Sequence, residues 1–276
     1  EDVDRISEAL FALKTNGGDE YCGQVVQVAT QQLKWSAGPR DLRAIFIAGN
    51  EPFTQGAVDY RVACKAAANK GITISTIHCG DRETGIAGQW EDGAKLADGS
   101  YFCINQDHKT RDIAAPQDTD LARLSNELNT TYLAYGSERE EAASRQEAQD
   151  TNAAKSAAGS AAARAGFKAS KQYRNSGWDL VDAVAEKQVK VEDLPADQLP
   201  DAMQSMDGPA RAKYVAEMAK KREAIQAEIR KLSDARDAFV AKERKRLAAE
   251  APAEAAAAAA PLAEAVLDAI KVQTSK

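Results

Sequence analysis

The segment Leu42–Gly56, LRAIFIAGNEPFTQG, constrains the fold of this chain more than any other. Its first seven residues, Leu42–Ala48, are mostly apolar and predict a buried strand. The strand runs directly into the turn Gly49–Pro52, and a helix-like segment follows. In an open parallel sheet, ligands bind outside the carboxyl ends of the strands. We therefore expect a functional site at this turn.

A second glycine-rich turn lies upstream, in the segment Thr15–Gly23, TNGGDEYCG. It carries two carboxylates, Asp19 and Glu20, and opens another helix-like segment. If the two turns face one another across the same edge of a sheet, they form a polar, acidic rim. The residues of this predicted rim are Asp19, Glu20, Asn50 and Glu51.

Helix-like and strand-like segments alternate up to about Gly136. The predicted strands are Leu42–Ala48, Ile72–Cys79 and Ser100–Ile104. Five helices are predicted. Two of them span Val58–Asn69 and Asp118–Tyr132. The other three are marked by apolar residues: Ile6, Leu10 and Leu13; Val25, Val26, Ala29 and Leu33; and Trp90, Ala94 and Leu96. Strands separated by helices of this length indicate parallel crossovers. We expect an α/β fold with a doubly wound, mostly parallel sheet covered on both faces.

The composition of the sequence changes after Gly136, and from there on the sequence predicts helices without strands. Four regions are expected: an α/β domain over residues 1–135, a helical or linker region over 136–205, a long amphipathic helix over 206–250, and an alanine-rich spacer with a terminal helix over 251–276. Residues 137–165 contain few large apolar groups and are typical of a solvated helix or a linker. Pro209 suits the first turn of the long helix.

In the long helix, apolar residues recur every seven positions, at Met218, Ile225, Leu232 and Phe239. Arg222 and Arg236 interrupt the second seam of this heptad pattern, which disfavours a symmetric coiled coil. We expect the helix to pack on apolar groups of the same chain, with a parallel coiled coil as the alternative. The expected contacts are Trp178, Leu180 and Val181.

Composition narrows the class of partner. The net charge is -6, from 36 basic and 42 acidic residues, so neither nucleic acid nor an anionic membrane would be attracted to the chain. No apolar run approaches the ~20 residues that cross a bilayer. We therefore expect another protein as the partner, no nucleic acid, and no membrane span in this chain.

The four cysteines, Cys22, Cys64, Cys79 and Cys103, form no CxxC pair, so a structural zinc site is not indicated. They are either buried free thiols or one or two disulfides of an exported protein, with Cys79 and Cys103 as a candidate pair. The sequence begins with Glu1 inside a helix-like pattern. We therefore expect an N-terminal portion to be missing, and we expect the complete protein in the periplasm or cell envelope.

The rim residues have two interpretations each. Asp19 and Glu20 either cap a helix start or ligate a hard divalent cation, Mg²⁺ or Ca²⁺, together with Asn50. Glu51 either joins the rim or points to solvent. His78 lies on an apolar strand and is interpreted as a core histidine. The sequence contains no GxSxG, P-loop or HExxH motif, so an enzyme is not indicated.

Four segments carry a resemblance to a known family: GGDEYCGQVV, LRAIFIAGNEPFTQG, ITISTIHCGD and AGQWEDGAKLADGSYFCINQD. In order and spacing they resemble the later part of a bacterial von Willebrand factor type A domain, over about residues 1–135. Downstream, YRNSGWDLVDAV and LPADQLPDAM are similar to the helical tails of one bacterial group of these proteins.

The resemblance implies a metal-ion-dependent adhesion site that binds a carboxylate of a partner protein. In the family, a DxSxS loop, a Thr and an Asp hold the ion. The DxSxS loop is not in this chain, the Thr position falls on Asp19, and the Asp position falls on Gly49 or, with a one-residue shift, on Asn50. An incomplete or degenerate site is therefore expected, with weak cation binding.

Two hypotheses of different classes remain. The first is a protein-interaction module of the von Willebrand A type whose helical tail is a spacer or docking arm. The second is a Rossmann-like small-ligand-binding protein or enzyme that uses Asp19, Asn50 and Glu51 around a phosphate or sugar. Fold alone does not separate them. The missing catalytic motifs favour the first.

Overall fold

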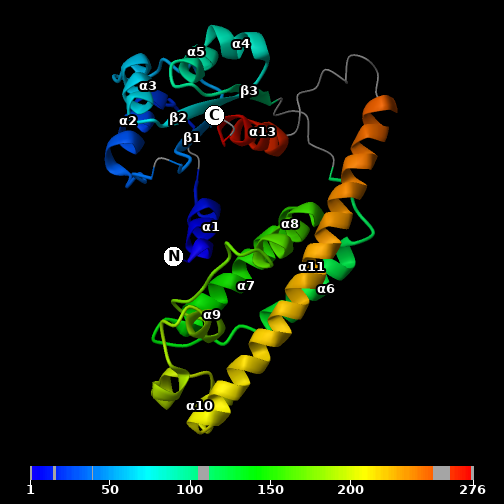
Figure 1. Cartoon of the computed structure of the whole chain (residues 1–276). Coiled ribbons are helices and arrows are strands. Elements are labelled where there is room, and N and C mark those ends of the chain that lie inside the picture. Colours follow the sequence, from blue (N-terminus) through cyan, green and yellow to red (C-terminus); the bar gives the residue numbers. More distant parts are fainter. Residues whose placement is uncertain (1, 15–16, 39, 105–111, 251–261, 275–276) are drawn as a thin grey trace. The chain divides into compact units, whose positions relative to one another are not determined.

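The computed structural model describes residues 2–14, 17–38, 40–104, 112–250 and 262–274 (Figure 1). The chain divides into two compact units. We call Thr15–Arg111 with Ala251–Lys276 the α/β unit, and Glu1–Lys14 with Asp112–Glu250 the helical unit. The predicted spacer over 251–260 lies outside the described residues.

The α/β unit contains three strands and five helices among the described residues. In chain order they are α2 (Cys22–Gln32), β1 (Ala44–Gly49), α3 (Tyr60–Asn69), β2 (Thr73–Cys79), α4 (Arg82–Ala87), α5 (Trp90–Lys95), β3 (Tyr101–Ile104) and α13 (Leu262–Thr274). The strand order is β1-β2-β3, and both pairs are parallel. Ile47 lies opposite Thr76, and Ile77 lies opposite Phe102. The three predicted parallel strands are confirmed.

One face of this sheet meets the core of the unit. Ile45, Ile47 and Ile74 pack in a cluster with buried residues from α2, α3 and α5. Phe46, between Ile45 and Ile47, points to the opposite face because side chains alternate along a strand, and it is 36% exposed. The cover expected on both faces is therefore incomplete at β1 among the described residues. The doubly wound arrangement stays a prediction.

The helical unit is built around one long helix. Its elements are α1 (Val3–Phe11), α6 (Asp118–Asn129), α7 (Arg139–Ser156), α8 (Ala158–Lys168), α9 (Leu180–Ala185), two short 3-10 turns (Val191–Asp193 and Ala196–Gln198), α10 (Asp201–Gln204) and α11 (Gly208–Glu250). Figure 1 shows α11 as a single unbroken helix, with α6 and α8 running beside it. The long helix predicted from Pro209 is confirmed.

This grouping departs from the domain boundary expected at residue 135. Helix α6, expected in the α/β domain, packs with α8 and α11 instead. Its buried residues Leu121, Leu124 and Leu128 form one stripe, and that stripe contacts Ile225 and Ile229 of α11. The stripe fits a helical neighbour as well as a sheet, so local periodicity did not reveal its partner.

The apolar stripe of α11 packs within the chain, as expected. Ile225 and Ile229 contact α6 and α8, whereas Val215 and Met218 contact a cluster that contains the predicted partners Leu180 and Val181. The third predicted partner, Trp178, is not in this cluster and stacks on Tyr132. The two arginines that interrupt the second seam are also buried. Arg222 pairs with carboxylates near α9, and Arg236 pairs with Asp118 at 2.6 Å. An intramolecular partner thus supplies the counter-charges that a symmetric coiled coil would lack.

Helix α1 does not bury the stripe that defines it in the sequence. Ile6 is 59% exposed and Leu10 is 62% exposed. The helix is held through its acidic side: Asp4 is buried, accepts a hydrogen bond of 2.6 Å from the Tyr173 hydroxyl and pairs with Arg164 at 2.6 Å. Ion pairs rather than an apolar face thus hold this helix, because the surface that it contacts in the helical unit is cationic. Among the described residues, no helix is both long enough and apolar enough to cross a membrane.

Candidate functional site

The turn after β1 is organised by the carboxylate of Glu20. Its Oε2 atom accepts hydrogen bonds from the backbone N–H of Asn50 at 3.0 Å and of Glu51 at 3.3 Å. The two glycine-rich turns therefore meet at the carboxyl end of β1, as the sequence predicts. The residue that joins them is Glu20.

Gly49 makes this approach sterically feasible. A Cβ atom at this position would lie 2.0 Å from Oε2 of Glu20 and 2.9 Å from Cη2 of Trp90. Only a residue without a side chain fits between these two groups. The glycine at this position thus has a structural reason of its own.

A short network fixes both sides of the contact. The backbone N–H of Glu20 donates to Oε1 of Gln55 at 2.6 Å, and Nε2 of Gln55 donates to the carboxylate of Glu51 at 3.4 Å. The side chain of Asn50 donates to the same carboxylate at 3.3 Å. The Trp90 indole N–H donates to the Glu51 carbonyl at 2.9 Å. The rim is therefore preorganised by groups from the α/β unit alone.

Asp19 is directed elsewhere. Its Oδ2 atom accepts a hydrogen bond from the Tyr21 hydroxyl at 3.2 Å, and no bond joins it to Asn50 among the residues that the structure describes. The hydrogen bond to Asp19 raises the pKa of Tyr21. Asp19 remains exposed and contributes charge to the outside of the rim.

The donor set of the rim is small for a cation. Within the described ranges, no group of three or more His, Cys, Asp or Glu side chains has the geometry of a metal site. The carboxylate of Glu20, which lies at the centre of the rim, already accepts two backbone hydrogen bonds. An added cation would compete with these bonds.

The other candidate residues of the α/β unit are a histidine near the end of β2 and the cysteines. His78 is buried, and its ring centroid lies 5.8 Å from that of Trp90, as expected of a core histidine; neither of its ring nitrogens, however, has a hydrogen-bond partner among the described residues. All four cysteines are free thiols, with Cys22 and Cys64 buried. Burial raises the pKa of each of these two thiols to about 12, so neither is a thiolate near neutral pH.

A row of apolar side chains runs along the outer face of α2, starting beside the rim. Its members are Tyr21, Val25, Val28 and Leu33, all exposed. Together with Gln24, Ala29 and Gln32 they line a shallow hollow of about 560 Å³. We call this surface the α2 row. It joins a helix face without charged residues to the acidic rim.

Val25 and Leu33, which mark this helix in the sequence, both lie on its exposed side. Val25 is 53% exposed and Leu33 is 59% exposed, whereas Val26 is buried. A Cβ atom at Gly23 would lie 2.3 Å from the Val58 carbonyl, so Gly23 marks the side of α2 that closely approaches the chain before α3. Two features of the sequence could have revealed this orientation: α2 carries more apolar residues than one buried stripe needs, and Gly23 lies on one of its sides.

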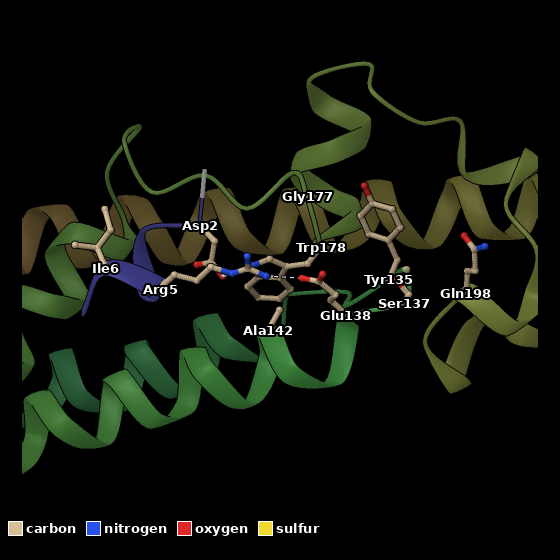
Figure 2. Close-up of a pocket in the computed structure, with 11 residues that line it drawn as sticks. Asp2, Arg5, Ile6, Tyr135, Ser137, Glu138, Ala142, Gly177, Trp178 and Gln198 are labelled. Carbon is tan, nitrogen blue, oxygen red and sulfur yellow. Dashed lines mark hydrogen bonds and ion pairs between the residues drawn. The ribbon is translucent and has the colours of Figure 1, made fainter. Parts of the chain in front are cut away.

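A second hollow, of about 850 Å³, lies in the helical unit. Figure 2 shows Arg5 and Glu138 meeting across it beside Trp178, with Gln198 at one end. The indole nitrogen of Trp178 has no partner among the described residues, yet it is buried from solvent. A molecule in the hollow therefore does not reach this donor, and the remaining lining gives no ligand class.

Comparison with known proteins adds no relative: no family model, no curated protein and no solved structure matches this chain.

Proposed function

We propose that the α/β unit is a protein-interaction module of the von Willebrand factor type A kind, with an incomplete metal-ion-dependent adhesion site. The observation that carries the proposal is the α2 row, a continuous line of exposed apolar side chains that begins at an acidic rim. Contiguous apolar patches bordered by polar residues mark protein interaction sites. The partner buries the α2 row and places basic groups near Asp19 and Glu51.

In this proposal the rim does not depend on a cation for its shape. Glu20 holds the turn after β1 through the backbone of Asn50 and Glu51. A divalent cation such as Mg²⁺ or Ca²⁺ then binds weakly and contributes little to recognition. The partner is captured by apolar contact and by opposite charge, since the rim residues are acidic.

The small-ligand alternative has weaker support. A phosphate would bind through free backbone N–H groups at such a turn. At this turn, the N–H groups of Asn50 and Glu51 already donate to Glu20, and the neighbouring carboxylates repel an anion. A phosphate-binding enzyme would need this arrangement to open.

A peptide library selected on the wild-type chain tests the proposal. We expect the selected peptides to combine apolar residues with lysine or arginine. Val25→Asp on α2 should weaken their binding by roughly tenfold or more, equivalent to about 1.4 kcal/mol. Asp19→Lys should weaken it and reduce its salt dependence. Val62→Asp is the matched control, because Val62 on α3 is 64% exposed and lies outside the α2 row.

Two results would contradict the proposal. One is equal binding of the selected peptides to the wild-type chain and to Val25→Asp. The other is competition between the peptides and inorganic phosphate, which would move the site to the turn amides.

A further inference from the structure

The carboxyl ends of β2 and β3 bring a histidine and a cysteine side by side. His78 of β2 lies opposite Cys103 of β3 in the register of the two parallel strands. Side chains at opposite positions project to the same face of the sheet, and neighbouring strands lie about 4.8 Å apart. We propose that Cys103 is a modification site, a nucleophilic thiol that a small hydroperoxide oxidises to a sulfenic acid, with His78 as the acceptor of its proton. This inference concerns β2, β3 and α4 and does not rest on the α2 row.

The imidazole of His78 has no other hydrogen-bonding role in the part of the chain that the structure describes. The residue is buried, and both ring nitrogens lack a partner there. A neutral imidazole carries one donor and one acceptor nitrogen, and leaving a buried polar group unpaired is costly. The backbone encloses the ring, because a Cβ atom at Gly80 would lie 2.6 Å from Nε2 and one at Gly85 would lie 2.7 Å from Cδ2. A base that is held in place without a partner is therefore available to a neighbouring thiol.

The hydroxyl group of Tyr101 joins the two side chains. It lies 2.8 Å from Sγ of Cys103 and donates to the carbonyl of Arg82 at 3.0 Å. The Cβ atom at Gly85 that would meet the imidazole of His78 would also lie 2.1 Å from this hydroxyl oxygen. The phenol and the imidazole thus both contact Gly85, and the thiol contacts the phenol. If the O–H bond rotates from the Arg82 carbonyl to the sulfur, it stabilises a thiolate, because hydrogen bonds to a charged acceptor are the stronger ones.

Burial separates Cys103 from the other three thiols. Cys22 and Cys64 lie in the core of the α/β unit, and burial raises the pKa of each to about 12. Burial also raises the pKa of Cys79, and its side chain projects to the opposite face because it directly follows His78 on β2. Cys103 is partly exposed. Reactive cysteines are partly exposed and lie beside basic groups, and of the four thiols Cys103 meets both conditions.

A cation lies on the side of the thiol. The guanidinium carbon of Arg82, at the start of α4, is 5.1 Å from the centroid of the Tyr101 ring, whose hydroxyl contacts Cys103. Arg82 pairs with Glu91 of α5 at 3.7 Å, and Glu91 also pairs with Lys95 at 2.7 Å, so that carboxylate is shared between two cations. A nearby positive charge favours the thiolate form of a cysteine.

Carboxylates lie on the side of the imidazole. Glu20 lies against Gly49, the residue opposite His78 on β1. Asp81 follows the end of β2 and caps the start of α4. Negative charge near an imidazole favours its protonated form. Transfer of the proton from Cys103 to His78 therefore places each new charge near a group of opposite charge.

The oxidation balances within this cluster. The proton of the Cys103 thiol passes to His78, and the thiolate attacks the terminal oxygen of the hydroperoxide. The S–O bond forms as the O–O bond breaks, so the sulfur gives up two electrons and the leaving oxygen receives them. His78 then returns the proton to the leaving oxygen, which departs as water or an alcohol. The product is a sulfenic acid, which persists because Cys79 projects to the other face of the sheet and is not placed to form a disulfide with it.

Trapping of the sulfenic acid tests the site. The full chain is treated with hydrogen peroxide at neutral pH in the presence of dimedone, which labels sulfenic acids, and peptide mass spectrometry locates the label. We expect Cys103 to be labelled roughly tenfold faster than any other thiol of the chain. Cys79→Ser is the control and should keep this label, whereas Cys103→Ser should lose it. A wild-type chain that is not labelled at Cys103, or that is labelled equally at Cys79, would overturn the inference.

The pH dependence of alkylation tests the role of His78. At neutral pH, iodoacetamide should modify Cys103 roughly tenfold more slowly in His78→Asn than in the wild type, whereas near pH 10, where hydroxide removes the proton, the two rates should be equal. A disturbed fold would instead accelerate modification of the buried Cys22 and Cys64. A folded His78→Asn chain with an unchanged rate at neutral pH would contradict the proposal. If this variant does not fold, Tyr101→Phe decides, since loss of the hydroxyl should slow the reaction and an unchanged rate would again contradict the proposal.

Discussion

Arg222 and Asp179 form a buried, two-pronged ion pair, with Nη1 2.7 Å from Oδ2 and Nη2 3.1 Å from Oδ1. The guanidinium also donates to the hydroxyl and the carbonyl of Thr131, at 3.1 Å and 2.7 Å. Its carbon lies 4.1 Å from the centroid of the Tyr132 ring. A charge on the packing face of α11 is thus compensated by α9 and the segment after α6.

Removing this arginine should strongly destabilise the helical unit. Arg222→Met leaves the buried Asp179 carboxylate without its counter-charge, so we expect the free energy of unfolding to fall by about 3–5 kcal/mol. Urea denaturation measures the change. Lys213→Met on the same helix, where the side chain is 80% exposed, should change it by less than about 0.5 kcal/mol. Equal effects of the two substitutions would show that the ion pair contributes no net stability.

The ion pair between the half-buried Asp150 and the buried Lys168 should make the stability of the helical unit depend on pH. Burial is the largest influence on the pKa of Asp150 and raises it, but the Lys168 ammonium, 2.6 Å away, and hydrogen bonds from Asn129 and Arg164 bring the net pKa below its usual value. The carboxylate form is therefore favoured in the folded state. Its contribution is present above the unfolded pKa of about 3.9 and is lost as pH falls through the lower folded pKa.

Asp150→Asn removes this titrating group. We expect a less stable protein at neutral pH and a shallower loss of stability below about pH 4. Urea unfolding across this range measures both effects. The exposed Asp120→Asn is the control for the chemical change itself. An unchanged acid profile in Asp150→Asn would assign the acid sensitivity to other carboxylates.

The Glu20 contact should control the turn after β1. Glu20→Ala leaves the N–H groups of Asn50 and Glu51 without their acceptor, so we expect their hydrogen exchange to accelerate. The α/β unit should lose about 1–3 kcal/mol of stability. Glu83→Ala, at an exposed carboxylate on α4, serves as the control. Unchanged exchange at both amides in Glu20→Ala would mean that the turn holds its shape without Glu20.

Cation binding should be weak. We expect Mg²⁺ and Ca²⁺ to bind the chain at millimolar concentration or weaker, because the few oxygens of the rim do not replace the hydration shell of the ion. Asp19→Ala should leave this weak binding nearly unchanged, since Asp19 bonds to Tyr21 rather than to the turn. Titration calorimetry makes the measurement. Micromolar affinity that disappears in Asp19→Ala would contradict the expectation.

Local patterns predicted the elements well and their contacts less well. The strands at Ala44–Gly49 and Thr73–Cys79 follow from apolar runs bounded by glycine turns, and the parallel pairing follows from the helices between them. The sequence also predicted that the two glycine-rich turns meet, because parallel strands end at the same edge of a sheet. The sequence did not predict which of the two adjacent carboxylates, Asp19 or Glu20, bonds to the turn after β1, because this depends on the gap left beside Gly49.

The sequence by itself determined the periodic features: three parallel strands, the glycine turn after β1 and the heptad stripe of α11. These depend on neighbours in the chain, so periodicity reveals them. Only the tertiary structure decided which apolar faces are covered. Val25 and Ile6 lie on helix faces that look buried in the sequence, yet α2 turns its Gly23 side inward and α1 is held by the buried charge of Asp4. Burial is a property of the partner surface, and that surface comes from residues far away in the chain.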